Sequence, residues 1–385
     1  TVAVRPDAPS VTAAAETIKG KGDGKVTGVT TAMEYSTDGG QNWMPCAGAE
    51  ITDFAAGTAV LVRVKATSSA PHGEAASCAI GASENTLTVT FEENGGSEVT
   101  QITGLSYNAT ISAPTEPTKT GYTFAGWDTA ADGSGVKYTD QQEVENLSAT
   151  DGATITLYAQ WTANSNTAYT VQHWQQNLNG GNEHNDTNYT LTVTENLTDT
   201  TGADVTPAVK FYEGFTAPST QSVTIAADGS TKVNYYYTRN SYTVTLEKGT
   251  GIASVTGAGT YQYGESVTIS AEVSDGYVWS KWSDDHTDQE RIFTMGAENI
   301  TLTAQATPIT YTITYELGGG TADGNPASYT VETDSFTLEN PTRTGYTFAG
   351  WTGTGLDEAT ESVTIERGST GDRTYTATWT ANTYT

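Results

Sequence analysis

Apolar and polar residues alternate in short segments that recur along the chain. Leu87, Val89 and Phe91 alternate with Thr88, Thr90 and Glu92, and the same pattern returns over 242–247 and 311–317. A period of two places successive side chains on opposite faces, so each segment predicts a half-buried antiparallel strand. Gly-rich turns follow these strands at 94–96, 249–251 and 318–320.

A second set of alternating segments lies at 155–161, 300–305 and 375–380, and residues 233–237 have the same place in a further copy. Opening strands therefore begin near residues 87, 169, 242 and 311, each followed by a closing strand. This spacing predicts a tandem array of small β modules. The predicted modules are 85–164, 165–240, 241–308 and 309–382, and 383–385 is the expected start of another. Their linkers, such as 162–164 and 380–382, are short and predict an elongated, semi-rigid array.

Residues 1–84 have a different pattern. Residues 33–43 contain a strand, an Asp38-Gly39 turn and the start of another strand, and 59–66 is a further strand. This pattern predicts a small β-sandwich of the immunoglobulin or fibronectin type. Cys46 and Cys78 lie 32 positions apart in this segment. They either form one disulfide, in an oxidising compartment, or remain two buried thiols.

One long motif occurs twice. Residues 117–127 and 341–351 agree at ten of eleven positions, differing only in Lys119 and Arg343. Strict alternation would separate the Trp that ends each copy from the other aromatic residues. The preceding glycine, Gly126 in the first copy, predicts a β-bulge that returns Trp127 to their face. We therefore expect Trp127 and Trp351 in the cores of their modules; an exposed sugar-stacking surface is the alternative.

The composition is acidic and typical of strands. Lys and Arg number 17 against 45 Asp and Glu, and the net charge is -28. Such a charge disfavours nucleic acid and anionic lipid as partners, because both need a basic patch. Aromatic residues make up 10% of the chain, which is high for a disordered acidic sequence. No apolar segment is long enough to cross a bilayer, so direct membrane insertion is not expected.

The sequence contains no pattern that predicts catalysis or a cofactor. The four histidines have no metal-ligand spacing, and no nucleophile elbow or phosphate loop is present. Asp128, Asp132 and Ser134 offer oxygen ligands but lack a calcium-loop pattern, so Asp132-Gly133 is interpreted as a turn. A Lys–Asn isopeptide cross-link is one covalent possibility, and the lysines nearest to predicted strands are Lys210, Lys232 and Lys248.

The repeated motif resembles the internalin B-repeat, or Listeria–Bacteroides repeat, family. Residues 120–127, 132–135 and 157–161 carry this resemblance, and 309–382 carries it again through 345–351 and 375–379. Residues 241–308 resemble a divergent member, in which 275–282 replace the motif. Residues 165–240 resemble a mucin-binding-protein repeat through 169–174 and 233–237. The resemblance implies β-grasp-like modules of a bacterial cell-surface protein and supplies no catalytic residues.

The sequence thus predicts a mostly β, non-enzymatic, extracellular stalk or adhesin segment, monomeric and without a cofactor. One alternative is a module that binds carbohydrate or mucin, with host or environmental glycans as partners. Another is an accessory region of a large secreted glycan-degrading enzyme. The aromatics of the divergent modules are better candidates for ligand contact than the motif tryptophans, although core or rim packing is favoured for each of them: His173, Trp174, Trp279 and Trp282.

Overall fold

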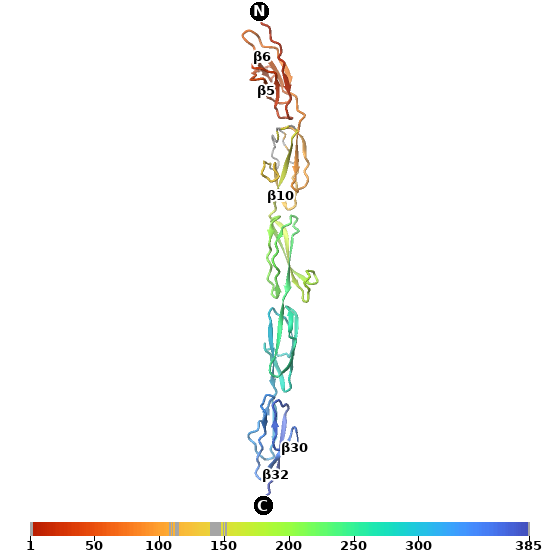
Figure 1. Cartoon of the computed structure of the whole chain (residues 1–385), viewed down its shortest axis with the longest axis vertical. Helices are drawn as coiled ribbons and strands as arrows, with labels where there is room; N and C mark the ends of the chain where they lie inside the picture. The colour runs from red at the N-terminus through yellow and green to blue at the C-terminus, as the bar shows by residue number, and fades with distance from the viewer. Residues whose placement is uncertain are drawn as a thin grey trace. The chain divides into compact units, whose positions relative to one another are not determined.

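The fold was examined in a computed structural model, in which residues 3–107, 109, 111, 115–138, 148, 150 and 152–383 are described. These residues form β-strands joined by turns and contain no helix (Figure 1). The mostly β prediction is therefore confirmed. The chain start at Thr1, and Tyr384 and Thr385 of the predicted next module, lie outside the described residues.

Contacts divide the chain into two compact units. The first contains Thr1–Thr170, Asn196–Thr206 and Ser222–Lys232, and the second contains Val171–Glu195, Pro207–Gln221 and Val233–Thr385. The strands of each sheet come from within one predicted module, but the division between the units passes through 165–240. The module limits therefore remain predictions.

The N-terminal segment folds as two sheets around one core. One sheet has the order β1-β2-β5 and the other β4-β3-β6-β7. Val26, Phe54, Val60 and Val62 are buried together and come from both sheets, so the two inner faces form a sandwich. Its strands are β1 Thr12–Ala14, β2 Gly24–Thr27, β3 Met33–Ser36, β4 Met44–Pro45, β5 Glu50–Phe54, β6 Ala59–Val64 and β7 Ala76–Ala79.

Both cysteines belong to this sandwich and are free thiols in the structure. Cys46 is buried in the core, and Cys78 on β7 packs against it with its thiol directed at the Val60 carbonyl oxygen, 3.7 Å away. Burial raises the pKa of both thiols. The structure thus has two free thiols, of which Cys46 is buried and Cys78 is half-buried.

The next sheet has the order β11-β10-β12-β8-β9. Its core contains Val89, Trp127, Leu157 and Ala159, with Phe91, Phe124 and Trp161 packed at the edge. These strands are β8 Leu87–Glu92, β9 Ile102–Leu105, β10 Tyr122–Asp128, β11 Lys137–Tyr138 and β12 Thr154–Ala163.

The strands of residues 165–240 form a sheet of order β14-β13-β18-β16 and a short pair, β15-β17. The buried side chains of the sheet are unusually polar, since His173 and the tyrosines at 235 and 237 are among them. The strands are β13 Thr167–Gln176, β14 Tyr189–Asp199, β15 Asp204–Val205, β16 Phe215–Thr216, β17 Val223–Thr224 and β18 Lys232–Arg239.

Residues 241–308 and 309–382 each contain two sheets around one core. The orders are β21-β19-β25-β23 with β20-β22-β24, and β27-β26-β32-β29-β30 with β28-β31. The strands are β19 Ser241–Lys248, β20 Ile252–Thr256, β21 Gly259–Gln262, β22 Ser266–Val273, β23 Tyr277–Trp282, β24 Glu290–Thr294, β25 Ile300–Pro308, β26 Tyr311–Glu316, β27 Ser328–Tyr329, β28 Phe336–Thr337, β29 Tyr346–Gly353, β30 Leu356–Thr360, β31 Thr364–Ile365 and β32 Arg373–Ala381.

The opening and closing strands pair in parallel, which corrects the expectation of antiparallel opening strands. Strands β8 and β12, β19 and β25, and β26 and β32 are parallel neighbours at the centres of their sheets. Their other neighbours are antiparallel, so these sheets are mixed. Alternation reports which face is buried and carries no information about strand direction. The parallel central pair is the feature that makes these modules β-grasp-like.

The predicted bulge in the repeated motif is confirmed. Pairing shifts register between Phe124 and Gly126 in β10, and again between Phe348 and Gly350 in β29. Gly126 and Gly350 have φ of 113° and 124°, which L side chains rarely adopt. The shift places both tryptophans in their cores, where Trp127 is 6% exposed and Trp351 is fully buried.

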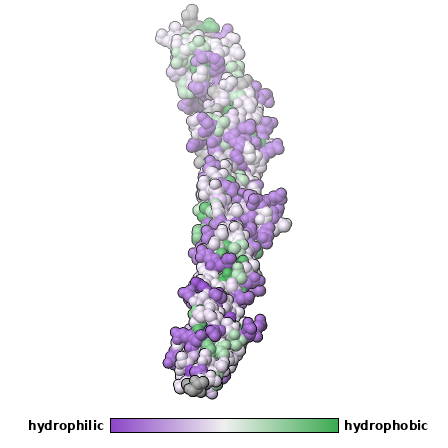
Figure 2. Space-filling model, turned by 60° about the horizontal axis from the view of Figure 1, so that its bottom comes forward, coloured by the Kyte–Doolittle hydropathy of each residue, from purple (hydrophilic) through white to green (hydrophobic). Residues whose placement is uncertain are grey.

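The polar residues of the alternating strands lie at the surface. Figure 2 shows a face on which hydrophilic residues predominate and hydrophobic residues occur in small groups. The apolar faces of the strands are instead used in the four clusters of buried residues described above. A surface of this kind, with a net charge of -28, favours solubility.

Candidate functional site

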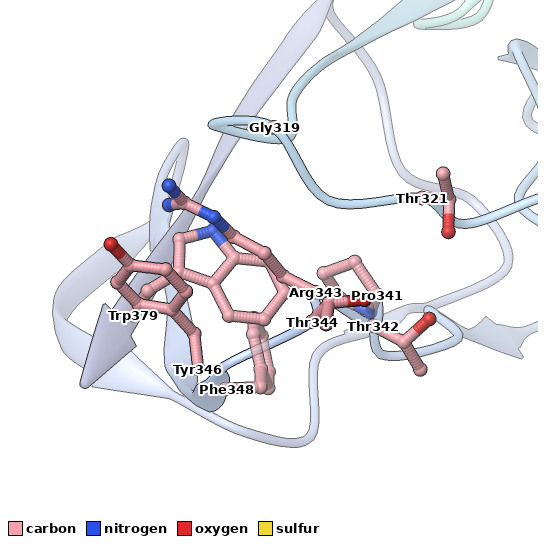
Figure 3. A pocket seen from close by; sticks show the side chains of 9 residues that line it. All are labelled: Gly319, Thr321, Pro341, Thr342, Arg343, Thr344, Tyr346, Phe348 and Trp379. Carbon is pink, nitrogen blue, oxygen red and sulfur yellow. The ribbon is translucent and has the colours of Figure 1, made fainter. Parts of the chain in front are cut away.

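A groove beside the second copy of the repeated motif is the strongest candidate for a ligand site. Its volume is about 550 Å³, and aromatic, hydroxyl and guanidinium groups line it (Figure 3). The residues come from the turn after β26, the turn before β29, and strands β29 and β32. They are Gly319, Thr321, Pro341, Thr342, Arg343, Thr344, Tyr346, Phe348 and Trp379.

Local backbone bonds hold the walls of this groove. Thr321 and Thr342 exchange two hydrogen bonds of 2.9 Å, which join the two turns. The amide of Tyr346 donates to the carbonyl oxygen of Arg343 at 3.2 Å. The indole N–H of Trp379 donates to the carbonyl oxygen of Leu317 at 3.1 Å, so this ring is fixed by the neighbouring strand.

Arg343 lies over the aromatic side of the groove. Its guanidinium carbon is 3.8 Å from the ring centre of Tyr346 and 5.9 Å from that of Trp379, as Figure 3 illustrates. Tyr346 is 37% exposed. No ion pair among the described residues includes Arg343, although the chain carries 45 carboxylates. The groove thus combines a stacking ring with a cation that no described carboxylate neutralises.

In the first copy of the motif, the equivalent cation is Lys119, and its ammonium has a different partner. Lys119 lies 4.7 Å from the ring centre of Tyr122, but its ammonium donates to the carbonyl oxygen of Asn94 at 2.8 Å. Trp161 is fixed by a 2.9 Å bond to the carbonyl oxygen of Glu93. The Lys119 ammonium is therefore bonded to the turn after β8. The two grooves differ in this way although their motifs agree at ten of eleven positions.

His173 lies in a buried polar cluster. It is fully buried, and its Nδ1 is 2.8 Å from the hydroxyl of Tyr237. Its Nε2 is 3.1 Å from Glu195, whose other carboxylate oxygen accepts from the ammonium of Lys210 at 2.6 Å. The hydrogen bond from Lys210, followed by that from His173, lowers the pKa of Glu195. His173 is thus a core residue, in line with the core packing favoured for it, and is not available as a ligand-contact ring.

Trp174 is half-buried and belongs to a group of aromatic rings on the other face of β13. Its ring stacks near Tyr236 at 5.9 Å, and His184 lies nearly parallel to Tyr236 at 3.9 Å. Tyr189 packs edge-on against both His184 and Tyr236. Sequence reasoning singled out Trp174 alone. The alternation of 233–237 places Tyr236 on the face opposite the buried tyrosines. This pattern could have identified Tyr236 as a neighbour of Trp174.

Trp279 and Trp282 occupy the places of Phe124 and Trp127. The register of β23 shifts between Trp279 and Lys281, as it does in the other copies. Trp282 is fully buried and donates to the carbonyl oxygen of Asp288 at 3.0 Å. Trp279 is half-buried and donates to the carbonyl oxygen of Thr287 at 2.7 Å. Trp282 is therefore a core ring and Trp279 a rim ring, which is the packing favoured for them over a free stacking surface.

This copy also differs in a pair of facing residues. Phe124 faces Trp161 across the strands, and Phe348 faces Trp379. At the same pair in β23 and β25, Trp279 faces Ala306. The tryptophan therefore lies on the opposite strand, and an alanine replaces its aromatic partner.

The remaining sequence-predicted groups have local roles. Asp132 accepts from the amide and hydroxyl of Ser134 at 3.0 and 2.6 Å, and these bonds lower the pKa of Asp132. It lies in a turn with Gly133, as predicted. Asp128 is buried and its Oδ1 accepts from two backbone amides. The described part of the chain contains no group of three side chains able to hold a metal ion.

The lysines considered for a cross-link make ordinary contacts. Lys210 pairs with Glu195, and Lys248 donates to the carbonyl oxygen of Ala253 at 3.4 Å. Lys232 is exposed at the start of β18. Among the residues that the structure describes, no helix has the length and hydrophobicity to span a membrane.

Comparison with known proteins identifies three segments as repeats. Residues 88–160 and 311–378 match the Listeria-Bacteroides repeat domain, and residues 242–310 match the divergent InlB B-repeat domain. The resemblance predicted for these segments is therefore confirmed. Repeats of this type are typical of surface proteins.

Two relatives come from Evansella cellulosilytica. A "Putative membrane protein" is 28% identical over 298 residues, which cover 69% of this chain and 39% of the relative. A "Putative Gly-rich membrane protein" is 27% identical over 295 residues, covering 69% of this chain and 31% of the relative. The chain thus spans well under half the length of these relatives. Among solved structures, the Bacillus anthracis TIE protein aligns with 78% of this chain and 73% of its own, with 10% identity and a TM-score of 0.29.

Proposed function

We propose that this chain is a non-enzymatic stalk segment of a bacterial surface adhesin, located outside the cell. The observation that carries the proposal is that the repeated motif builds the core of its module. Its most distinctive residues, Trp127 and Trp351, are buried in module cores and are not directed at a ligand or a reacting group. Repetition then serves length and display, which is the usual purpose of arrays of small modules.

The other parts of the chain fit the same purpose. The strand orders β1-β2-β5 and β4-β3-β6-β7 support an immunoglobulin- or fibronectin-like module at the N-terminus. We assign residues 165–240 to a mucin-binding-protein-like repeat on the pattern of 169–174 and 233–237. The linkers between successive strands are short, since β18 ends at Arg239 and β19 begins at Ser241. Short linkers restrict bending between modules.

Surface labelling tests this proposal directly. An antibody raised against the purified chain is applied to intact and to permeabilised cells of the source bacterium. We expect intact cells to be labelled as strongly as permeabilised ones, and protease treatment of intact cells to remove the signal. Labelling that requires permeabilisation would contradict a stalk outside the cell. The reading frame on both sides of the segment separates an adhesin from the accessory region of a glycan-degrading enzyme.

Acidic-sugar binding is a second candidate function, and the Arg343 groove favours it. An exposed tyrosine ring can stack on a sugar, and a guanidinium without a carboxylate partner suits a uronic acid. Glucuronic acid and glucose form a matched pair of probes that differ in the carboxylate. We expect binding of glucuronic acid that R343A removes and K119A retains. Equal binding of glucose, or retention in R343A, would contradict this assignment.

A further inference from the structure

A glycine followed by an aromatic residue begins one strand in each of the four repeat modules. The pairs are Gly121-Tyr122, Gly214-Phe215, Gly276-Tyr277 and Gly345-Tyr346. The four glycines have φ of 78°, 76°, 81° and 80°, a conformation that favours glycine. We call each of these positions a glycine corner.

Each glycine corner is bonded to the linker that leaves its module. The carbonyl oxygen of Gly121 accepts from the amide of Asn164 at 2.9 Å, and that of Gly214 accepts from Asn240 at 2.9 Å. The corresponding bonds are 2.8 Å from Ile309 to Gly276 and 3.0 Å from Asn382 to Gly345. The corner therefore fixes the point at which the chain passes to the next module.

The following module also bonds to the corner or its linker. In the first compact unit, the hydroxyl of Thr201 donates to the carbonyl oxygen of Gly121 and its amide donates to that of Asn164, both at 2.9 Å. In the second unit, the amide of Tyr263 donates to the carbonyl oxygen of Asn240 at 2.8 Å. There too, the hydroxyl of Tyr277 donates to Glu332 at 3.0 Å.

The following module packs against the open side of the glycine itself. A Cβ at Gly121 would lie 2.6 Å from the carbonyl oxygen of Ala227. A Cβ at Gly214 would lie 2.2 Å from the ring of Tyr263, and a Cβ at Gly276 would lie 2.1 Å from Cγ1 of Val331. These separations are shorter than any real carbon contact, so no side chain fits at these three positions.

We propose that the glycine corner is the docking surface through which one repeat module holds the next. Its partner is the near end of another repeat of the same chain, which supplies a hydrogen-bond donor or acceptor and a residue that fills the space beside the glycine, through its backbone at Ala227 and through its side chain at Tyr263 and Val331. Three corners with three different partner residues use the same construction, so it is independent of the details of any one module. The inference concerns how the modules are joined and does not depend on what the array displays.

The corner at Gly276 allows the sharpest test, because the severe clash comes from Cγ1 of Val331 at 2.1 Å, whereas the next atoms, Cγ2 of Thr370 and Cβ of Val331, lie at 3.2 Å. G276A introduces a Cβ against Cγ1 of Val331, and V331A removes that atom. G355A is the matched control, since Gly355 has φ of 71° with no neighbour within 4 Å of a Cβ. The four variants are G276A, V331A, G276A/V331A and G355A. The readout is hydrogen exchange of the Ile309 amide, which bonds to Gly276, beside amides in the centre of β25.

We expect G276A to accelerate exchange of the Ile309 amide about tenfold, which corresponds to about 1.4 kcal/mol, because the overpacked contact opens more readily. G355A should leave this amide unchanged. In the V331A background, G276A should have a clearly smaller effect, since the clashing atom is gone. The proposal is overturned if G276A accelerates exchange equally with Val or Ala at position 331. A general acceleration over β25 in G276A would mean that the glycine stabilises its own module, which also contradicts it.

Discussion

Two buried tryptophans at the same place in the motif differ in one hydrogen bond, and this difference is testable. The indole N–H of Trp282 donates to the carbonyl oxygen of Asp288 at 3.0 Å. The N–H of Trp351 is buried and has no partner among the described residues. Both side chains are fully buried. Replacing each by phenylalanine removes the same atoms from two equivalent cores.

The expected costs follow from what each variant loses. Shrinking an indole to a phenyl ring opens a cavity in either core, which costs on the order of 1–3 kcal/mol. W282F also loses a hydrogen bond, worth about 0.5–1.5 kcal/mol. W351F removes an unpaired buried donor, whose burial costs about 1–3 kcal/mol. The cavity cost is common to both variants, so we expect W282F to destabilise its module by about 3 kcal/mol more than W351F destabilises its own.

Hydrogen exchange measured in the intact chain gives this comparison module by module. The slowest amides of β25 report the opening free energy around Trp282, and those of β32 report that around Trp351. Each variant is measured in the full chain, and exchange is followed amide by amide. The comparison therefore does not depend on a single unfolding transition shared by several modules. Each variant leaves the other module as an internal standard.

The reasoning fails if W351F costs as much as W282F or more. Such a result would mean that the Trp351 N–H has a partner of its own, such as an ordered water, and is not an unpaired donor. A large loss of exchange protection in the module that was not changed would instead show that the two cores are coupled.

Three further predictions concern other parts of the chain. The pKa of Glu195 lies below its ordinary value of 4.5, so its carboxylate stabilises the fold above that pH. This stability is lost as the pH falls through the folded pKa of Glu195. Urea titrations at pH values from neutral to below 4.5 should show the loss in the wild type and a flatter profile in E195Q. Because Cys46 is buried and Cys78 is half-buried, native alkylation should be slow and slowest at Cys46, and unfolding without reductant should allow modification of both thiols, by intact mass; no alkylation would reveal a disulfide. Y346A should change the opening free energy of its module by about 0.5 kcal/mol or less and W351A by about 3–5 kcal/mol, in the exchange experiment above, and similar costs would contradict their assignment to surface and core.

The candidate groove could be predicted only in part. The sequence identified the motif that surrounds it and the exchange of Lys119 for Arg343. The partners of these two cations depend on turns that follow other strands, so sequence identity could not reveal that the Lys119 ammonium is bonded to the turn after β8. The ligand-contact residues chosen from the divergent modules included His173 and Trp282, both of which are buried. Divergence made these residues candidates for ligand contact, whereas at Trp279 the change places the tryptophan of a packed pair on the opposite strand, with Ala306 facing it.

The sequence by itself determined the strands, the faces they bury and the bulge before each motif tryptophan. These features depend on local geometry, since alternation follows the pleat and the bulge follows from a glycine between aromatic residues. Only the tertiary structure decided that opening and closing strands are parallel, that His173 pairs with Tyr237 and Glu195, and that the glycine corners contact the next module. Each of these depends on residues tens of positions apart, whose meeting is set by packing and not by any local preference.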